Sequence, residues 1–317
     1  MNVLYIDPRM RVVEKEYSFY SGLFDELEKI TNCYLFTGVC KDIASVIKIC
    51  PFDPDVIVFG LGFFAQHTFE KIEGLKELDI PVVCYMFKHH LDIHEKLYFF
   101  EINKVSVILT PLPLYKSYEE QTGCPARLFP YGTDPDIFKD RKLEKVYDFG
   151  FSGALHDSKL YVNGSFRSAN LRSKIQNLVK QQKDLKCFLN GSDSIKPRIN
   201  SREEYAEKIN QSKIWLSTTS PFGDIPGRYF EVGMSRTLIF TNPIPLEYRG
   251  ILQDGVNCIQ FSEDLSDFLD KLYYYLKNED KRQEIVDNAY ECFRANHTWK
   301  YRAEEMLRII KSLSNTL

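Results

Sequence analysis

The sequence predicts an α/β protein made of two doubly wound parallel-sheet domains in tandem. Short apolar runs, typical of buried strands, alternate along the chain with segments of helical periodicity. This alternation stops once, at the polar and aperiodic segment Tyr131–Glu144, and then starts again. The length of 317 residues also fits about two domains. We therefore expect one domain over residues 1–132, a linker over 133–146 and a second domain over 147–299.

Six apolar runs predict the strands of the first domain. One helix is predicted between the first two of them, at Ser18–Ile30, because its apolar residues recur at helical spacing. The predicted strands are Val3–Ile6, Cys33–Phe36, Val56–Phe59, Val82–Met86, Val105–Leu109 and Ala126–Phe129.

The second domain repeats the alternation and ends in consecutive helices. Its predicted strands are Tyr147–Phe151, Lys186–Leu189, Ile214–Leu216, Leu238–Thr241 and Asn257–Phe261. Its predicted helices are Leu171–Gln181, Ser201–Gln211, Gly227–Met234, Glu263–Lys277 and Lys281–Ala295, and Lys300–Ser312 ends the chain. Open parallel sheets bind ligands at the carboxyl ends of their strands, so we expect the site in a cleft between the two sheets.

Composition excludes several classes of protein. A hydrophobic fraction of 44% and a charged fraction of 27% exclude a largely disordered chain. The net charge of −3 argues against a dedicated nucleic-acid binder, whose affinity rests on a basic face. Residues 1–140 carry a net charge of −7 and residues 141–317 a net charge of +4, so the second half is better suited to an anionic ligand, although charge counts ignore placement.

Cysteine usage and the absence of long apolar runs indicate a cytoplasmic protein. The chain has eight cysteines and no CxxC pair, so a zinc ribbon or a thioredoxin motif is not expected. The start MNVLYIDPRM lacks the pattern of a signal peptide. No apolar run approaches the 18 or so residues that a membrane span needs. We expect reduced thiols in the cytoplasm.

The segment Arg228–Thr241 carries the first candidate site residues. Its short helix starts after a Gly- and Pro-containing loop and places Arg228 and Glu231 one turn apart. A guanidinium suits phosphate oxygens, and a carboxylate can accept two hydrogen bonds from a vicinal diol such as that of a ribose. The alternative is an exposed Arg–Glu pair on an amphipathic helix.

The motifs of the second half resemble those of GT-B glycosyltransferases. Four motifs carry the resemblance, in the family's order: Phe129–Phe138, Tyr147–Gly153, Arg228–Thr241 with Asp254–Asn257, and His297–Trp299 with Arg302. They are closest to the family 4-like and spore-maturation-type glycosyl transferase group. The resemblance is specific from about Phe129 to the end, whereas the first 128 residues match in layout only.

The resemblance implies transfer of a sugar from a nucleotide-sugar donor, with a UDP- or GDP-sugar expected and no further cofactor or bound metal. Retention of anomeric configuration and a final helix over 300–317 that packs back on the first domain are implied as well. Glu231 would bind the ribose, Gly227 and Arg228 would meet the diphosphate, and the turn at Ser152 and Gly153 would let the backbone approach the donor. The acceptor, a sugar, glycan or protein, stays open.

One position departs from the family pattern. Many members carry an acidic residue eight positions before the ribose-binding glutamate, where this chain has Gly223. We expect Asp224, the next residue, to make the contact with the sugar hydroxyls in place of that acid. A catalytically inactive nucleotide-sugar-binding or partner-binding module and a GT-B-fold epimerase therefore remain as alternatives.

Basic residues follow the glycine turn. In the family, Arg or Lys from this region neutralises the leaving diphosphate. Arg167 and Arg172 are the candidates here, and a solvated helix face is the alternative, which fits Lys174 best. The fourth basic residue of the cluster is Lys159.

Three of the six histidines fall within six residues directly after the fourth predicted strand, at His89, His90 and His94. Family members carry a histidine at this strand end, near the donor sugar, so His89 or His90 is the expected contact. A metal site using His90 and His94, or plain surface histidines, are the alternatives. In the same domain, Asp7 ends the first strand and the aromatic residues of Tyr17–Gly22 either stack on an acceptor sugar or belong to the core.

Overall fold

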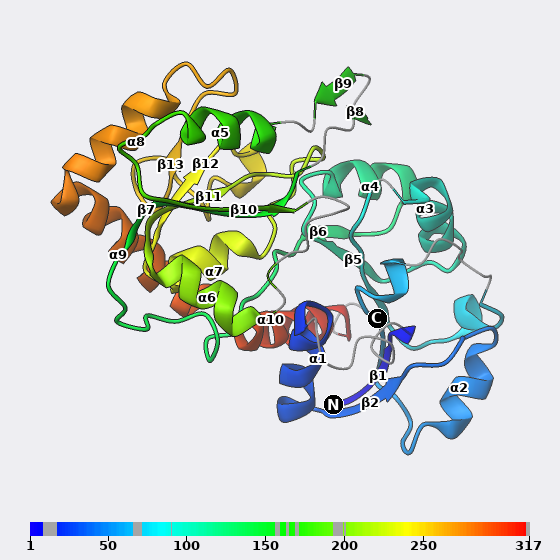
Figure 1. Cartoon of the computed structure of the whole chain (residues 1–317). Helices are drawn as coiled ribbons and strands as arrows, with labels where there is room; N and C mark the ends of the chain where they lie inside the picture. Colours follow the sequence, from blue (N-terminus) through cyan, green and yellow to red (C-terminus); the bar gives the residue numbers. More distant parts are fainter. Residues whose placement is uncertain are drawn as a thin grey trace. The chain divides into compact units, whose positions relative to one another are not determined.

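The computed structural model describes residues 1–8, 18–65, 72–89, 91–155, 159–162, 165–168, 171–192, 199 and 201–314 (Figure 1). The chain forms two compact units. Unit 1 comprises Met1–Gly132 and Trp299–Leu317, and unit 2 comprises Thr133–Thr298. No helix in the described part of the chain has both the length and the apolar character needed to cross a membrane.

Unit 1 is built on a six-stranded parallel sheet in the order β2-β1-β3-β4-β5-β6. Its strands are β1 (Asn2–Ile6), β2 (Asn32–Phe36), β3 (Val56–Phe59), β4 (Val82–Tyr85), β5 (Val107–Thr110) and β6 (Ala126–Leu128). Its α-helices are α1 (Ser18–Ile30), α2 (Ile43–Ile49), α3 (Ile93–Ile102), α4 (Tyr115–Thr122) and α10 (Trp299–Ser314), with short 3-10 turns η2 (Phe63–Ala65) and η3 (Leu75–Glu77).

Helices α2, α3 and α4 are present where no helix was predicted. Helix α2 has only seven residues, and it is started by Asp42, whose carboxylate accepts hydrogen bonds from the N–H groups of Ala44 and Ser45. Helix α3 buries Lys96 beside Leu97, Phe99 and Phe100. A charged residue on the buried face interrupts the apolar stripe by which a helix is recognised in a sequence.

Helix α10 packs on α1 in unit 1, although it comes from the far end of the chain (Figure 1). The buried indole of Trp299 lies against Gly22 so closely that a Cβ added at Gly22 would fall 2.4 Å from two ring atoms. A Cβ added at Gly132 would lie 2.7 Å from the backbone nitrogen of the same tryptophan. Trp299, at the start of α10, therefore packs both on α1 and on Gly132, the last residue of the first segment of unit 1.

Unit 2 has a five-stranded parallel sheet in the order β10-β7-β11-β12-β13, which repeats the strand order of unit 1. Its strands are β7 (Tyr147–Ala154), β10 (Cys187–Ser192), β11 (Ser212–Ser217), β12 (Leu238–Thr241) and β13 (Ile259–Gln260). Its α-helices are α5 (Leu171–Lys180), α6 (Arg202–Asn210), α7 (Arg228–Met234), α8 (Phe268–Lys277) and α9 (Glu279–Asn296), with the 3-10 turn η4 (Leu246–Tyr248).

The helices of unit 2 cover both faces of its sheet. Figure 1 shows α5 and α8 on one face and α6 and α7 on the other. The core on the first side joins Phe149, Ile214 and Phe240 of the strands to Ile175 of α5 and Phe268 of α8. In both sheets the strand order reverses beside the first strand of the unit, between β1 and β3 and between β7 and β11. Ligands of doubly wound sheets bind at this reversal, outside the carboxyl ends of the strands.

Two predicted segments of unit 2 differ from the structure. Between β7 and α5, where no strand was predicted, lie two antiparallel strands, β8 (Lys159–Val162) and β9 (Ser165–Ser168). Helix α8 begins at Phe268 and not at Glu263, because Leu265 takes a left-handed φ of 66°. The Asp267 carboxylate also accepts a hydrogen bond from the Ser262 N–H at 2.7 Å, which closes a turn before the helix.

Substituting Gly22 tests the packing of α10 on α1. We expect Gly22→Val to lower the free energy of unfolding by about 1–3 kcal/mol, because the added side chain would overlap the Trp299 ring. Urea denaturation measures the loss. Gly250→Val is the control, since an added Cβ there meets no atom within 4 Å. Equal losses for the two variants would contradict the tight contact.

Candidate functional site

Two arginines meet over one glycine at the carboxyl edge of the unit 2 sheet. Gly153, near the end of β7, has a φ of 156°, and a Cβ added there would lie 3.2 Å from Nη1 of Arg228. The same Cβ would lie 3.6 Å from Nη1 of Arg172. A side chain at position 153 would therefore occupy the space in front of both guanidinium groups. The structure thus brings together Gly153, Arg172 and Arg228, three of the predicted site residues.

Arg172 is fixed by hydrogen bonds to two strand ends. Its Nε donates to Oγ1 of Thr218, directly after β11, at 2.8 Å. Its Nη1 donates to the carbonyl oxygen of Ala154, the last residue of β7, at 3.1 Å. Arg172 is therefore not part of a solvated helix face, and it spans the point where the strand order reverses. Lys174, on the same helix, is exposed.

Arg228 has a buried donor without a partner. It is the first residue of α7 and is partly buried, and its Nη1 makes no hydrogen bond within the part of the chain that the structure describes. Buried charged donors are almost always satisfied, because leaving one unpaired costs about 1–3 kcal/mol or more. The side chains of Arg228 and Glu231 are both partly buried. The interpretation as an exposed Arg–Glu pair is wrong.

Two carboxyl groups lie close to the arginine pair. Burial raises the pKa of Glu231 to about 7, although the charges of Arg228 and then Arg202 act in the opposite direction. Burial likewise raises the pKa of Asp224 to about 6, against the effects of a backbone hydrogen bond and of the charges of Arg228 and Arg172. The Asp224 carboxylate also accepts a hydrogen bond from the Ser220 hydroxyl. The guanidinium groups thus act against the effect of burial on the pKa of both carboxyl groups.

Polar residues that sequence reasoning missed complete this edge of the sheet. The Asn242 amide, after β12, donates to Oγ1 of Thr219 at 2.8 Å and accepts from the Thr219 N–H at 3.0 Å. Arg202, at the start of α6, forms an ion pair with Asp134 at 3.5 Å, and its charge lowers the pKa of Glu231. The available signal was positional, because Thr218, Thr219 and Asn242 directly follow buried strands.

Other predicted residues of unit 2 are only partly placed. Ser152 is buried in the β7–β10 ladder, opposite Asn190. Gly227 is buried, and its carbonyl oxygen accepts hydrogen bonds from the Phe230 and Glu231 N–H groups at 3.0 and 3.1 Å. The backbones of Lys159 and Arg167 lie in the hairpin β8–β9, and their side chains lie outside what the structure describes.

His89 of unit 1 is held by a tyrosine. Its Nδ1 lies 2.8 Å from the Tyr118 hydroxyl, and the two rings stack with centroids 5.9 Å apart. His94 is exposed on α3, and His90 lies outside the described residues. Within the described ranges, no group of three or more His, Cys, Asp or Glu side chains is placed to share a metal ion.

The structure describes only part of the region after β1 in which contacts with an acceptor sugar were considered. Asp7 is fully buried after β1, and its Oδ2 accepts a hydrogen bond from the Gly62 N–H at 2.8 Å. Residues 9–17 lie outside the described ranges, as do the side chains of residues 18–20. The aromatic residues of Tyr17–Gly22 thus stay a prediction.

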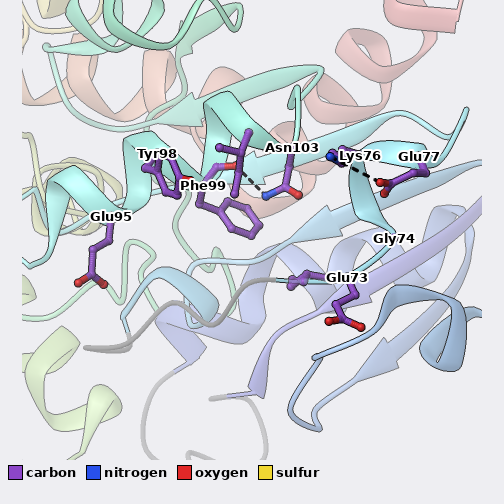
Figure 2. A pocket seen from close by; sticks show the side chains of 10 residues that line it. Glu73, Gly74, Lys76, Glu77, Glu95, Tyr98, Phe99 and Asn103 are labelled. Atoms are coloured by element: carbon purple, nitrogen blue, oxygen red, sulfur yellow. Dashed lines mark hydrogen bonds and ion pairs between the residues drawn. The ribbon is translucent and has the colours of Figure 1, made fainter.

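A separate pocket of about 580 Å³ lies in unit 1 between η3 and α3 (Figure 2). Figure 2 shows Glu73, Glu77, Glu95 and Lys76 around it, with Tyr98 and Phe99 on the α3 side; Lys76 is the one lysine among its described lining residues. None of its lining residues was predicted as a site residue. Three carboxylates against one ammonium make this pocket unsuitable for a diphosphate.

Replacing Glu231 tests its unusual environment. In the folded protein its pKa is about 7, above the unfolded value, so the folded state holds the proton more tightly between about pH 4.5 and 7. The contribution of this group to stability therefore falls as pH rises through that window. We expect the free energy of unfolding of Glu231→Gln, taken relative to that of the wild type, to rise by about 1–3 kcal/mol between pH 5 and pH 8.

Urea denaturation at the two pH values measures this gain. Glu263→Gln, which alters an exposed carboxylate, is the matched control and should show none. A gain for Glu231→Gln that does not change with pH would contradict the raised pKa.

Comparison with known proteins identifies the fold of the chain and a family pattern in one of its segments. Residues 170–308 match the family described as glycosyl transferase-like. HepE from Anabaena, solved in complex with UDP and glucose, has a TM-score of 0.59 and 12% identity, with 98% of this chain and 100% of that chain covered. A comparison with curated protein sequences gives no match.

Two further solved structures are similar over their whole length. Sucrose-phosphate synthase from Thermosynechococcus elongatus has a TM-score of 0.61 and 10% identity, with 100% of both chains covered. AviGT4, a glycosyltransferase involved in avilamycin A biosynthesis, has a TM-score of 0.59 and 11% identity, with 100% of this chain and 99% of that chain covered. The predicted architecture is confirmed: the chain has the GT-B glycosyltransferase fold, and its residues 170–308 carry the glycosyl transferase-like family pattern.

Proposed function

We propose that this protein transfers a sugar from a nucleotide-sugar donor, with the donor diphosphate bound by Arg172 and Arg228 in front of Gly153. The observation that carries the proposal is the buried, unpartnered Nη1 of Arg228, next to a backbone position where a side chain would fill the space. A diphosphate supplies the acceptor oxygens that this donor lacks. The glycosyl transferase-like match over residues 170–308 and the UDP and UDP-glucose complexes of HepE support the same ligand class.

The arginine pair suits the chemistry of the leaving group. When the bond between the sugar and the phosphate breaks, negative charge grows on the nucleoside diphosphate. Arg172 is already held by Thr218 and Ala154, so it needs little reorganisation as that charge develops. Preorganised cations stabilise the transition state more than the ground state, and this difference is what accelerates the reaction.

Glu231 is the proposed partner of the ribose. A vicinal diol offers two O–H donors, which favour the ionised carboxylate over the neutral acid. In the ligand-free protein the pKa of about 7 leaves the group partly protonated at neutral pH. Binding of the nucleotide therefore stabilises the charged form, with Arg202 and Arg228 acting in the same direction.

The remaining roles follow from the family resemblance. Asp224, and His89 or His90, are the proposed contacts of the donor sugar. Retention of anomeric configuration is proposed because the motifs are closest to those of family 4. In that mechanism the donor phosphate helps to deprotonate the acceptor, so neither a separate catalytic base nor a metal ion is needed. A UDP-sugar is the first donor to test.

A non-catalytic nucleotide-sugar-binding module is the second candidate. The observation that favours it is Gly223, which stands where many family members carry an acid, while Asp224 hydrogen-bonds to Ser220 within its own loop. Turnover separates the two functions. Release of glucose or transfer from radiolabelled UDP-glucose supports the enzyme, whereas binding without either supports the module.

Removing the Arg228 guanidinium tests the diphosphate site. We expect Arg228→Ala to weaken UDP binding by about 10- to 100-fold, because charged hydrogen bonds contribute about 1.5–3 kcal/mol. The rate constant kcat should fall by about 100-fold or more. Arg228→Lys should recover only part, since an ammonium lacks the planar fork.

Isothermal titration calorimetry with UDP and steady-state kinetics provide the measurements. Arg294→Ala is the control, because this arginine is exposed on α9 and pairs with Glu291. Wild-type affinity and kcat for a folded Arg228→Ala protein would exclude the diphosphate role.

The ribose role predicts a pH dependence. If only the ionised Glu231 binds the diol, UDP affinity rises as pH increases through about 7. We expect the ratio of wild-type to Glu231→Gln affinity to increase about tenfold from pH 6 to pH 8. Using the ratio cancels the titration of UDP itself. A ratio that stays constant over this range would remove Glu231 from the ribose site.

A further inference from the structure

A fully buried lysine lies beneath the strand end that presents His89. Lys96 of α3 is 0% exposed. Its Nζ donates to the carbonyl oxygens of Phe87 and Lys88, the residues that lead from β4 to His89, at 3.1 and 2.9 Å. We propose that Lys96 is a positioning residue that fixes His89 at the carboxyl end of β4. The inference rests on the proposed role of His89 as a contact of the donor sugar.

The backbone that Lys96 holds has an unfavourable conformation. Lys88 takes a left-handed φ of 55°, which non-glycine residues rarely adopt. Its carbonyl oxygen accepts hydrogen bonds both from Nζ of Lys96 and from the Leu91 N–H at 3.0 Å. The surrounding contacts must keep such a residue in place, because the conformation alone costs about 1–3 kcal/mol. The ammonium of Lys96 is a contact of this kind.

An apolar residue would fill the position of Lys96 at lower cost. Burying an ammonium group is unfavourable, and burial lowers the pKa of Lys96 to about 8, although Asp92 opposes this effect. An ammonium has three donors and no acceptor, which suits backbone carbonyl groups that end a strand. The gain that offsets the burial is therefore the order of the segment Phe87–His89.

The ring of His89 is held independently of its backbone. Tyr118 of α4, which is 1% exposed, meets Nδ1 with its hydroxyl at 2.8 Å and stacks on the imidazole. This hydrogen bond occupies Nδ1, so a contact between His89 and a sugar has to be made through Nε2. Lys96 on the backbone side and Tyr118 on the ring side together set the direction of Nε2.

Histidine NMR tests this assignment without any substrate. In protein labelled with ¹⁵N-histidine, the Nδ1 and Nε2 shifts report the tautomer and the pKa of each ring. We expect Lys96→Met to move the His89 signals, because the segment Phe87–His89 loses its tether and the Tyr118 hydrogen bond weakens. The signals of the exposed His94, on the same helix as Lys96, should stay unchanged.

Lys145→Met is the matched control. Lys145 of unit 2 is also a lysine whose pKa burial lowers, to about 7, and its Nζ donates to the Arg236 carbonyl oxygen and the Thr237 hydroxyl at 2.7 and 2.9 Å. Its substitution removes a comparable tether in the other unit. It should lower stability without moving the His89 signals.

Kinetics then connect the tether to the reaction. We expect Lys96→Met to lower kcat for UDP-sugar turnover about tenfold while UDP affinity stays within about twofold. In a His89→Ala background the same substitution should cause no further loss, since the residue that Lys96 positions is already gone. A merely structural role predicts equal losses in the two backgrounds.

Three outcomes decide the proposal. Shifted His89 signals together with a non-additive loss support it. Unchanged His89 signals, or a full additional loss of kcat in the His89→Ala background, overturn it. Lys96→Gln replaces Lys96→Met, with the same criteria, if the latter does not fold. A failure of UDP to bind the wild type would count against the proposed function alone, because the NMR result does not depend on UDP.

Discussion

Two positive charges face the same small space at the end of β7, and the rest of the unit 2 site depends on how they are held. Arg172 is tied to the ends of β7 and β11, while Arg228 approaches from α7 with one donor unpaired. The parallel sheet makes this possible, because the carboxyl ends of neighbouring strands meet at one edge. Gly153 keeps the space open, since any Cβ there would meet both side chains.

The neighbouring acids balance this charge without cancelling it. Burial brings the pKa values of Glu231 and Asp224 to about 7 and about 6, so both carboxylates take up protons just below neutral pH. An ionised Glu231 can accept the ribose hydroxyls, whereas a protonated one leaves more of the arginine charge uncompensated before a ligand binds. Partial protonation preserves a positive potential in the absence of a ligand.

Sequence patterns predicted the strands of both sheets well, because buried parallel strands are short continuous apolar runs. Val56–Phe59 agrees residue for residue with β3. The patterns missed α3, because Lys96 stands on its buried face, and they placed the start of α8 too early, because the left-handed Leu265 has no signature in the sequence. Motifs singled out Gly153, Arg172 and Arg228, which the structure brings together. They could not locate Thr218 or Asn242, whose roles arise only when the strands are assembled.

The packing of α10 in unit 1, after the whole of unit 2 in sequence, also has a consequence for the synthesis of the protein. Residues 1–132 leave the ribosome before unit 2, but the indole that covers Gly22 follows only after the whole of Thr133–Thr298 has been synthesised. At about 5–20 residues per second, this delay is about ten to thirty seconds. Unit 2 is continuous in sequence and can complete its fold during that time. Unit 1 is therefore completed after unit 2, and until then α1 lacks its contact with α10, an incomplete state of the kind that chaperones recognise.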